Sequence, residues 1–183
     1  MLSRRRFLSA QSSDAYRPPW AVDESDFIRD CTRCGDCIAV CEERIITKGP
    51  GGFPQVSFED SGCTFCGKCR DACQTGALSS KQAGIESKQA GNENVKPWSL
   101  MAVIELSGCL VTQGVMCQSC RDFCDSSAIV FDYHQPIPVP EIKESLCTGC
   151  GFCIGACPTK AIKAVKAESL AGCQQQAKQV NHG

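Results

Sequence analysis

The stretch CTGCGFCIGACP, residues 147–158, contains the most regular cysteine motif of this chain. Its four cysteines follow the spacing C-x2-C-x2-C-x3-C, and a proline follows the last of them. CTRCGDCIAVC at residue 31 and CTFCGKCRDAC at residue 63 align with it without gaps. A looser copy, CLVTQGVMCQSCRDFC, starts at residue 109 and has seven residues rather than two between its first two cysteines. The sequence is therefore organised around four copies of one cysteine motif.

The four copies form two tandem pairs, because the first two start 32 residues apart and the last two 38 residues apart. Between the pairs lies a polar stretch in which SKQAG occurs twice, which is typical of a linker or a surface loop. The predicted organisation is a basic leader with the segment RPPW at 1–24, an N-terminal module at 25–79, a polar linker at 80–97, a C-terminal module at 98–168 and a polar tail at 169–183.

The composition limits what can stabilise this chain. Leu, Ile, Val and Phe account for only 38 of its 183 residues, which is close to the roughly 20% below which a chain struggles to build a core. The 17 cysteines offer the missing stabilisation. The formal charge of −1 argues against a nucleic-acid-binding protein, which needs basic residues to neutralise phosphate. No run approaches the ~18 apolar residues of a membrane span.

The spacing within the motif is the bacterial ferredoxin signature for a 4Fe-4S cluster. A tight loop of this kind lets three thiolates converge on one inorganic core. Gly35, Gly67 and Gly151 each follow the second cysteine of a motif, and we expect positive φ angles there, which glycine adopts most readily. Bound clusters would then be the main source of stability, so that stripping them unfolds the chain.

Each cluster is expected to take three cysteines from one motif and the fourth from its paired motif, because the fourth cysteine should start a helix that points away. The predicted sets are Cys31, Cys34, Cys37 and Cys73 for the first cluster; Cys63, Cys66, Cys69 and Cys41 for the second; Cys147, Cys150, Cys153 and Cys124 for the third; and Cys109, Cys117, Cys120 and Cys157 for the fourth. The long gap after Cys109 leaves a labile or three-iron cluster open as the alternative at the fourth site.

Zinc and disulfides are the alternative uses of these cysteines. C-x2-C pairs are common zinc ligands, but a third cysteine three residues on is surplus to a tetrahedral site. Disulfides would indicate a secreted scaffold, yet the motif places neighbours too close for separate bridges, and no secretory signal is present. Cys173 lies outside every motif, and we expect a free, exposed thiol there, with a replacement cluster ligand as the other interpretation.

No catalytic constellation is visible in the sequence. The two histidines, His134 and His182, have no nucleophile near them in sequence, and His134 is expected to be a solvated loop residue. All four cluster sites are expected to be closed by protein ligands. The prediction is therefore an electron-transfer or accessory protein rather than an enzyme.

The residues between the motifs predict an α+β fold made of short elements around the clusters. GPGGFPQVSF predicts a turn followed by a strand over 55–58, and AIVFDYHQPIPVPEI predicts a strand on either side of Pro136. An apolar pair follows the last cysteine of each motif, in EERII, QTGAL, SSAIV and TKAIK. A short helix that begins inside each cysteine run would bury this pair against the neighbouring cluster.

The first residues resemble a twin-arginine export address at SRRRFL, residues 3–8. An export signal also needs an apolar stretch of about 7 to 15 residues and a cleavage site, and acidic residues interrupt the chain where that stretch should lie. Three interpretations remain: a solvated terminus, a contact with an acidic partner surface, or a decayed signal. The segment RPPW, residues 17–20, is either a stiff polyproline turn that packs Trp20 over the first cluster module or a docking patch.

Taken together, several stretches resemble the NapF family, the ferredoxin-type accessory proteins of periplasmic nitrate reductase systems. They are the basic leader, RPPW, FIRDCTRCGDCIAVCEERII, GPGGFPQVSF, CTFCGKC, the split CLVTQGVMCQSCRDFC and LCTGCGFCIGACP. The resemblance runs from Ser3 to about Lys163. It implies a cytoplasmic protein that acts on the precursor of the catalytic subunit NapA before export, in loading or reducing its iron–sulfur centre. The alternative function is an electron-transfer ferredoxin between a reductase or quinol partner and a terminal enzyme.

The chain departs from the usual pattern of this family in three places. Gln74 stands where a proline often follows the second motif, the linker is long, and the tail carries Cys173. These departures leave cluster binding intact and put in doubt only the transfer of partner contacts to the linker and the tail.

Overall fold

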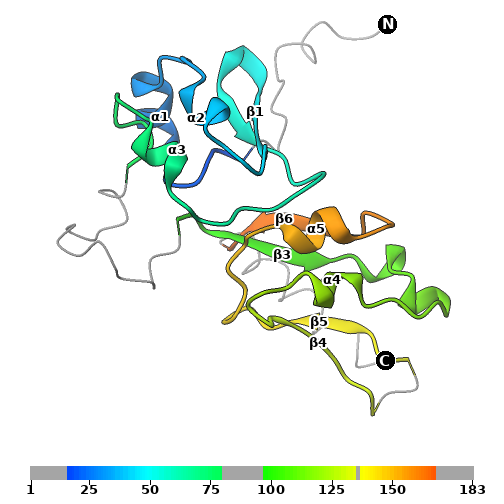
Figure 1. Ribbon diagram of the computed structural model, residues 1–183. Helices are drawn as coiled ribbons and strands as arrows, with labels where there is room; N and C mark the ends of the chain where they lie inside the picture. Colours follow the sequence, from blue (N-terminus) through cyan, green and yellow to red (C-terminus); the bar gives the residue numbers. More distant parts are fainter. Residues whose placement is uncertain (1–15, 80–96, 135–136, 168–183) are drawn as a thin grey trace, which may run out of the picture.

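The computed structural model describes residues 16–79, 97–134 and 137–167, which form two lobes (Figure 1). Short helices and two-stranded sheets alternate with the cysteine loops in both lobes, which confirms the predicted α+β class. The leader up to residue 15, the segment 80–96, Cys173 and His182 lie outside the described residues. The predicted module boundaries therefore stay predictions.

The N-terminal lobe contains one hairpin and three short helices. Its elements are α1 (Glu24–Asp30), α2 (Asp36–Ala39), β1 (Ile46–Lys48), the 3-10 turn η2 (Pro50–Gly52), β2 (Pro54–Val56) and α3 (Lys68–Asp71). β1 and β2 pair antiparallel. Tyr16 forms an isolated bridge with Val56, and Ala21 forms one with Leu78. Residues just before α1 therefore belong to the packing of this lobe.

The C-terminal lobe repeats the arrangement with longer strands. Its elements are β3 (Leu100–Ile104), η4 (Leu106–Gly108), η5 (Val111–Gln113), α4 (Ser119–Asp122), β4 (Ile129–Phe131), β5 (Pro140–Ile142), α5 (Phe152–Ala156) and β6 (Ile162–Lys166). β4 pairs with β5, and β3, which precedes the cysteine motifs of this lobe, pairs with β6, which follows them. The bridge between Ala21 and Leu78 holds the equivalent place in the N-terminal lobe.

The predicted strands are confirmed, with one shift. β4 and β5 lie on either side of Pro136, as the sequence predicts. The strand predicted over 55–58 is β2 and ends at Val56. Ser57 still donates its backbone N–H to the carbonyl of Ile45 at 2.8 Å, but the chain then leaves the hairpin and carries Phe58 towards the other lobe.

The predicted helices inside the cysteine runs are α2, α3, α4 and α5, and each begins one residue before the third cysteine of its motif. The expectation that the fourth cysteine starts a helix is wrong. Cys157 caps the C-terminal end of α5, and Cys41 lies two residues beyond the end of α2. Each of these helices is only four or five residues long, about one turn, and the last cysteine of its motif follows its C-terminal end.

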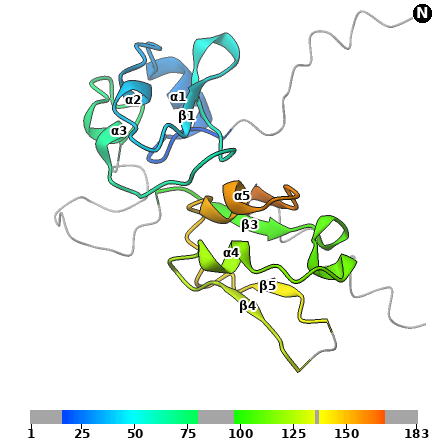
Figure 2. The same ribbon diagram turned by 45° about the vertical axis from the view of Figure 1, so that its right-hand side comes forward.

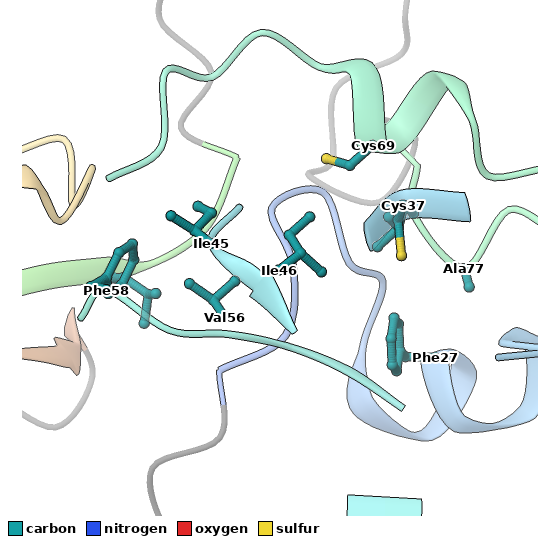
Figure 3. Close-up of a cluster of buried hydrophobic side chains, with 10 residues drawn as sticks. Phe27, Cys37, Ile45, Ile46, Val56, Phe58, Cys69 and Ala77 are labelled. Atoms are coloured by element: carbon teal, nitrogen blue, oxygen red, sulfur yellow. The ribbon is translucent and has the colours of Figure 1, made fainter. Parts of the chain in front are cut away.

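Small apolar side chains fill the N-terminal core. Ile45, Ile46 and Val56 lie between Phe27 at one end and Phe58 at the other (Figure 3). The apolar pairs predicted after the last cysteines are all buried: Ile45 and Ile46, Ala77 and Leu78, Ala128 and Ile129, and Ala161 and Ile162. Burial of these pairs is therefore a repeated feature of the fold.

The segment RPPW packs into this lobe. Pro18 is fully buried, and Trp20 packs against the core. The Arg17 guanidinium donates to both carboxylate oxygens of Glu24, at 2.6 and 2.9 Å, and its Cζ lies 4.8 Å from the centre of the Phe27 ring. This agrees with the packing interpretation of the segment.

The two lobes share apolar packing. Leu100 of β3 belongs to the buried cluster of the N-terminal lobe, and Ile154 and Ala164 pack against it. The Tyr16 hydroxyl donates to the carbonyl of Ala164 at 2.5 Å. Figures 1 and 2 accordingly show β6 and α5 on the side of the C-terminal lobe that faces the N-terminal lobe. Across residues 16–79, 97–134 and 137–167, no helix has the length and apolar character needed to cross a bilayer.

We expect Phe27→Ala to destabilise the cluster-loaded protein by about 3–5 kcal/mol, the usual cost of removing a buried phenyl ring. Phe27 is 0% exposed and also lines one of the cysteine cavities. The guanidinium midpoint for bleaching of the visible cluster absorption measures the effect. Ile28→Ala is the matched control, since this neighbour on α1 is 49% exposed; equal shifts in the two variants would contradict the assigned core.

Candidate metal centres

Four cavities in the protein are each lined by four cysteines. They are lined by Cys31, Cys34, Cys37 and Cys73; by Cys41, Cys63, Cys66 and Cys69; by Cys124, Cys147, Cys150 and Cys153; and by Cys109, Cys117, Cys120 and Cys157. We name them the first, second, third and fourth cavities. Each set holds three cysteines of one motif and the last cysteine of the paired motif. This is the grouping that crossed ligation requires, while the binding of iron by these thiols stays a prediction.

The short helix explains the crossing. A four-residue helix advances about 6 Å along its axis, so α2 separates Cys41 from the loop that carries Cys31 and Cys34. The chain then turns, and Ile45 and Ile46 line the same second cavity as Cys41. The apolar pair and the fourth cysteine thus enter one cavity together. The other three motifs repeat this arrangement.

The loops bend at glycine as predicted. Gly35, Gly67 and Gly151 have φ angles of 89°, 77° and 87°. The irregular motif has Gln118 at this position, with φ of −131°, so its loop takes a different path. Without a left-handed residue there, the extra residues upstream must bring Cys109 round to the cavity.

A second left-handed position occurs just before the second cysteine, and sequence reasoning missed it. Arg33, Phe65 and Gly149 have φ angles of 60°, 56° and 75°. Only Gly149 carries a signal in the sequence. A Cβ there would lie 2.1 Å from the carbonyl oxygen of Leu100, so the third loop requires glycine for space as well as for its backbone angle.

Three of the four last cysteines receive hydrogen bonds from the chain that follows them. Backbone N–H groups of Leu78, Ala128 and Ala161 donate to the Sγ atoms of Cys73, Cys124 and Cys157 at 3.3 to 3.4 Å. Hydroxyl groups of Thr75, Ser126 and Thr159 contact the same three sulfurs at 3.6 to 3.7 Å.

These contacts favour the thiolate form of Cys73 and Cys157. Burial opposes ionisation of Cys73, but the hydrogen bonds from Leu78 and Thr75 outweigh it and lower the pKa of that thiol. Burial is likewise outweighed at Cys157, where Thr159 and Ala161 lower the pKa. Metal ions bind thiolates rather than thiols. The two sites are therefore prepared for a positively charged partner.

The deeper thiols need that partner to ionise. Burial, followed by repulsion from neighbouring cysteines, raises the pKa of Cys37 to about 11 and that of Cys153 to about 12. Burial also raises the pKa of Cys69 and Cys120 to about 11 and that of Cys63 to about 12. A cationic inorganic core would reverse this effect, because a coordinating thiol loses its proton outright. The donor set of each cavity therefore fits an iron–sulfur cluster.

The geometry favours a cluster over the alternatives. The sixteen cysteines in the described residues are free thiols, so none of them forms a disulfide. Nor does any group of three or more His, Cys, Asp or Glu side chains in the described ranges stand close enough together to hold a single metal ion. A zinc ion needs its sulfurs about 2.3 Å from one point. Thiols spread around a wider cavity suit an inorganic core of several atoms.

The inserted residues at the fourth cavity fold into a turn of their own. Gly114 ends η5 with φ of 80°, and Val115 donates its N–H to the carbonyl of Leu110 at 2.9 Å. The hydroxyl of Thr112 lies within hydrogen-bonding distance of the carbonyls of Leu106 and Cys109. The insertion thus closes on itself, and Cys109 and Cys117 line one cavity.

His134 is exposed in the loop after β4, as predicted for a solvated residue.

We expect Cys41→Ala to damage the second cluster before the first, because Cys41 lines the cavity of Cys63, Cys66 and Cys69. Electron paramagnetic resonance of the reduced variant, compared with single variants of the first motif, shows which centre disappears. Cys173→Ala is the control, and it should change neither spectrum nor iron content. Loss of the first centre in Cys41→Ala would contradict crossed ligation.

Cys157→Ala should lower the iron content by about one cluster, roughly four iron atoms, and should perturb only the C-terminal pair. The fourth cavity lies between residues of the C-terminal lobe alone. Iron analysis together with anaerobic native mass spectrometry measures the loss. Iron missing from the N-terminal pair would be the contrary result.

Comparison with known proteins identifies the motifs. The 4Fe-4S dicluster domain family matches residues 30–77 and 115–161. The first segment contains eight of the sixteen cysteines and the second contains seven, because it begins after Cys109. The two tandem dicluster modules expected from the sequence are therefore confirmed, and Cys109 is the one cysteine of the sixteen beyond the match.

Similarity to individual proteins shows which family of ferredoxin-type proteins the chain belongs to. The ferredoxin-type protein NapF of Escherichia coli (strain K12) is 37% identical over 166 residues, which cover 88% of this chain and 93% of that protein. NapF of Haemophilus influenzae is 40% identical over 147 residues, covering 80% and 76%. The ferredoxin-type protein NapG of E. coli is 28% identical over 158 residues, covering 77% and 65%. The chain belongs to the NapF family of ferredoxin-type proteins, and its tandem 4Fe-4S dicluster domains are those of an iron–sulfur protein.

Proposed function

We propose that the protein holds four 4Fe-4S clusters through its sixteen motif cysteines and carries single electrons with them. The observation that supports this most directly is that each of the four cavities is lined by four thiols from the paired motifs. Four thiolates are the full ligand set of one such cluster. No iron position is then left open for a substrate, so the chemistry is electron carriage rather than turnover.

The proposed role is assistance in the maturation of the NapA precursor in the cytoplasm. The chain would load or reduce the iron–sulfur centre of that subunit before export. Membership of the NapF family supports this role, because the family resemblance carries the link to periplasmic nitrate reductase. It makes the protein an accessory factor that binds its client transiently.

The fourth cavity is the proposed place of exchange with the client. Its insertion lies at the end of the C-terminal lobe away from the N-terminal lobe (Figures 1 and 2). Met116 comes directly before Cys117 and is 91% exposed, and Val115 is 50% exposed. A ligand on a separately folded turn can move without disturbing the other cavities. This arrangement suits the delivery of electrons or of a labile cluster.

An electron-transfer ferredoxin is the second candidate function. The specific observation in its favour is that the four cavities run from one lobe into the other, with cysteines of the second and third in backbone contact. A chain of centres could then connect a reductase or quinol partner with a terminal enzyme. The two functions differ in what happens to the precursor.

The decisive experiment mixes purified, cluster-loaded protein with the purified NapA precursor. If the proposal is right, immobilised protein retains the precursor in both redox states, and incubation increases the iron content or the activity of the precursor. Met116→Ser should reduce the retention, because it removes the most exposed apolar side chain beside the fourth cavity. Leu146→Ser is the control, since Leu146 is 49% exposed and precedes the third-cavity ligand Cys147.

A different outcome would favour the second candidate. A steady catalytic current through the purified pair, with no change in the iron content or activity of the precursor, would rule out the maturation role. Native mass spectrometry under anaerobic conditions reports cluster number and bound partner in the same sample. It therefore tests the four-cluster proposal separately from the proposed client.

A further inference from the structure

The two lobes meet at two of the cysteine loops. The backbone N–H of Cys63 donates to the backbone carbonyl of Cys150 at 2.7 Å. Cys63 lines the second cavity and Cys150 lines the third. One cysteine loop of the N-terminal module is thus joined by a short hydrogen bond to one of the C-terminal module.

Glycine makes this approach possible. A Cβ on Gly62 would lie 2.6 Å from the backbone nitrogen of Phe152 and equally close to its ring. A Cβ on Gly151 would lie 2.2 Å from the ring of Phe58. Nonbonded carbon atoms do not approach so closely, because their best separation is about 3.5 to 4.0 Å. Any larger residue at either place must push the two loops apart.

Aromatic side chains fill the space beside the hydrogen bond. Trp98 packs edge-on against Phe58 at 5.7 Å and against Phe65 at 5.9 Å between ring centres. Phe65 belongs to the second-cavity loop. On the other side, a Cβ on Gly149 of the third-cavity loop would lie 3.1 Å from the indole nitrogen of Trp98. The indole therefore lies between both loops and fixes their separation.

Within each lobe the two cavities are also neighbours. Cys37 of the first cavity and Cys69 of the second lie on the contacting helices α2 and α3 (Figure 3) and belong to one buried cluster. Cys153 of the third cavity and Cys120 of the fourth lie on the contacting helices α5 and α4 and share the other buried cluster. The hydrogen bond between Cys63 and Cys150 therefore connects the two cavities of the N-terminal lobe with the two cavities of the C-terminal lobe.

We propose that the four clusters form one linear relay in the order first, second, third, fourth, and that the Cys63–Cys150 hydrogen bond is the junction where electrons cross between modules. The inference rests on the proposed ligation of clusters by these cysteines. Clusters held by the cysteines of neighbouring cavities would exchange single electrons, so that one cluster would be oxidised as the next is reduced, with no bond or proton changing place. A one-electron reductant, such as a photoreduced deazaflavin, supplies the electron.

Gly62→Ala tests the junction without removing a ligand. The added methyl group meets the backbone of Phe152, so the two loops separate. We expect unchanged iron content, severalfold slower electron redistribution between modules after flash reduction, and weaker spin–spin broadening in the electron paramagnetic resonance of the fully reduced protein. Hydrogen exchange at the Cys63 amide should quicken, because its acceptor is lost.

Gly108→Ala is the matched control. Gly108 also comes directly before the first cysteine of a motif, but a Cβ there would meet only Ala161 of the same lobe, at 3.3 Å. This variant should keep the wild-type redistribution rate and the wild-type broadening. The same slowing in both variants would show a general effect of the substitution and would overturn the assignment of the junction.

Gly155→Leu is a second substitution expected to separate the two lobes, this time from the C-terminal lobe. A Cβ at Gly155 would lie 3.2 Å from the backbone of Asp60, and leucine is a better helix former than glycine for α5. It should reproduce the effects of Gly62→Ala. Wild-type rates and broadening in an iron-complete variant whose Cys63 amide exchanges faster would overturn the proposal.

The wild-type protein gives an independent check. With a relay, flash reduction distributes electrons over all four centres at a rate that does not depend on protein concentration. If two centres equilibrate rapidly and the other two fill only in a concentration-dependent phase, the modules are not connected and the proposal fails. Iron analysis of the same sample reports the cluster number, so failure of the relay is distinguishable from failure of the proposed ligation.

Discussion

The constraint on which this structure depends is the convergence of four thiols on each of four small cavities. Such thiols resist ionisation on their own, because burial and mutual repulsion raise the pKa of the deepest ones. A positively charged inorganic core removes this resistance and joins segments that are distant in sequence. We therefore expect binding and folding to be one process. The small apolar core of Ile, Val, Ala and Phe side chains adds to the stability that the cysteine sites provide.

The repeated motif solves one geometric problem four times. In three of the motifs a loop with two left-handed residues presents three cysteines, and in all four a single helical turn then carries the fourth cysteine to the neighbouring cavity. An apolar pair follows it into the same cavity. The departures are local: Gln118 replaces the glycine of the fourth loop, and an extra turn compensates. The fold therefore tolerates an irregular loop where the cavity lies at the end of the molecule.

The contact between the lobes distinguishes this protein from two ferredoxin modules that are joined by a linker and do not touch. Glycines at 62 and 151 let the second and third cysteine loops touch, and Trp98 fills the gap beside them. The segment RPPW contributes indirectly, because Pro18 and Trp20 build the wall of the N-terminal lobe. The two lobes can in this way behave as a single unit, with one end near the first cavity and the other near the fourth.

The motif repeats, the fold class, the family and the short helices inside the cysteine runs could all be predicted from the sequence, because cluster loops impose strict spacing and leave a periodic signal. The sequence also indicated the glycine bends and the buried apolar pairs. It misplaced the fourth cysteine, which ends a helix rather than starting one, because spacing does not show where a single helical turn begins. The left-handed angles of Arg33 and Phe65 and the junction between Cys63 and Cys150 were decided only by tertiary structure. Cys63 and Cys150 come together through packing between residues far apart in the chain, and no local pattern records such packing.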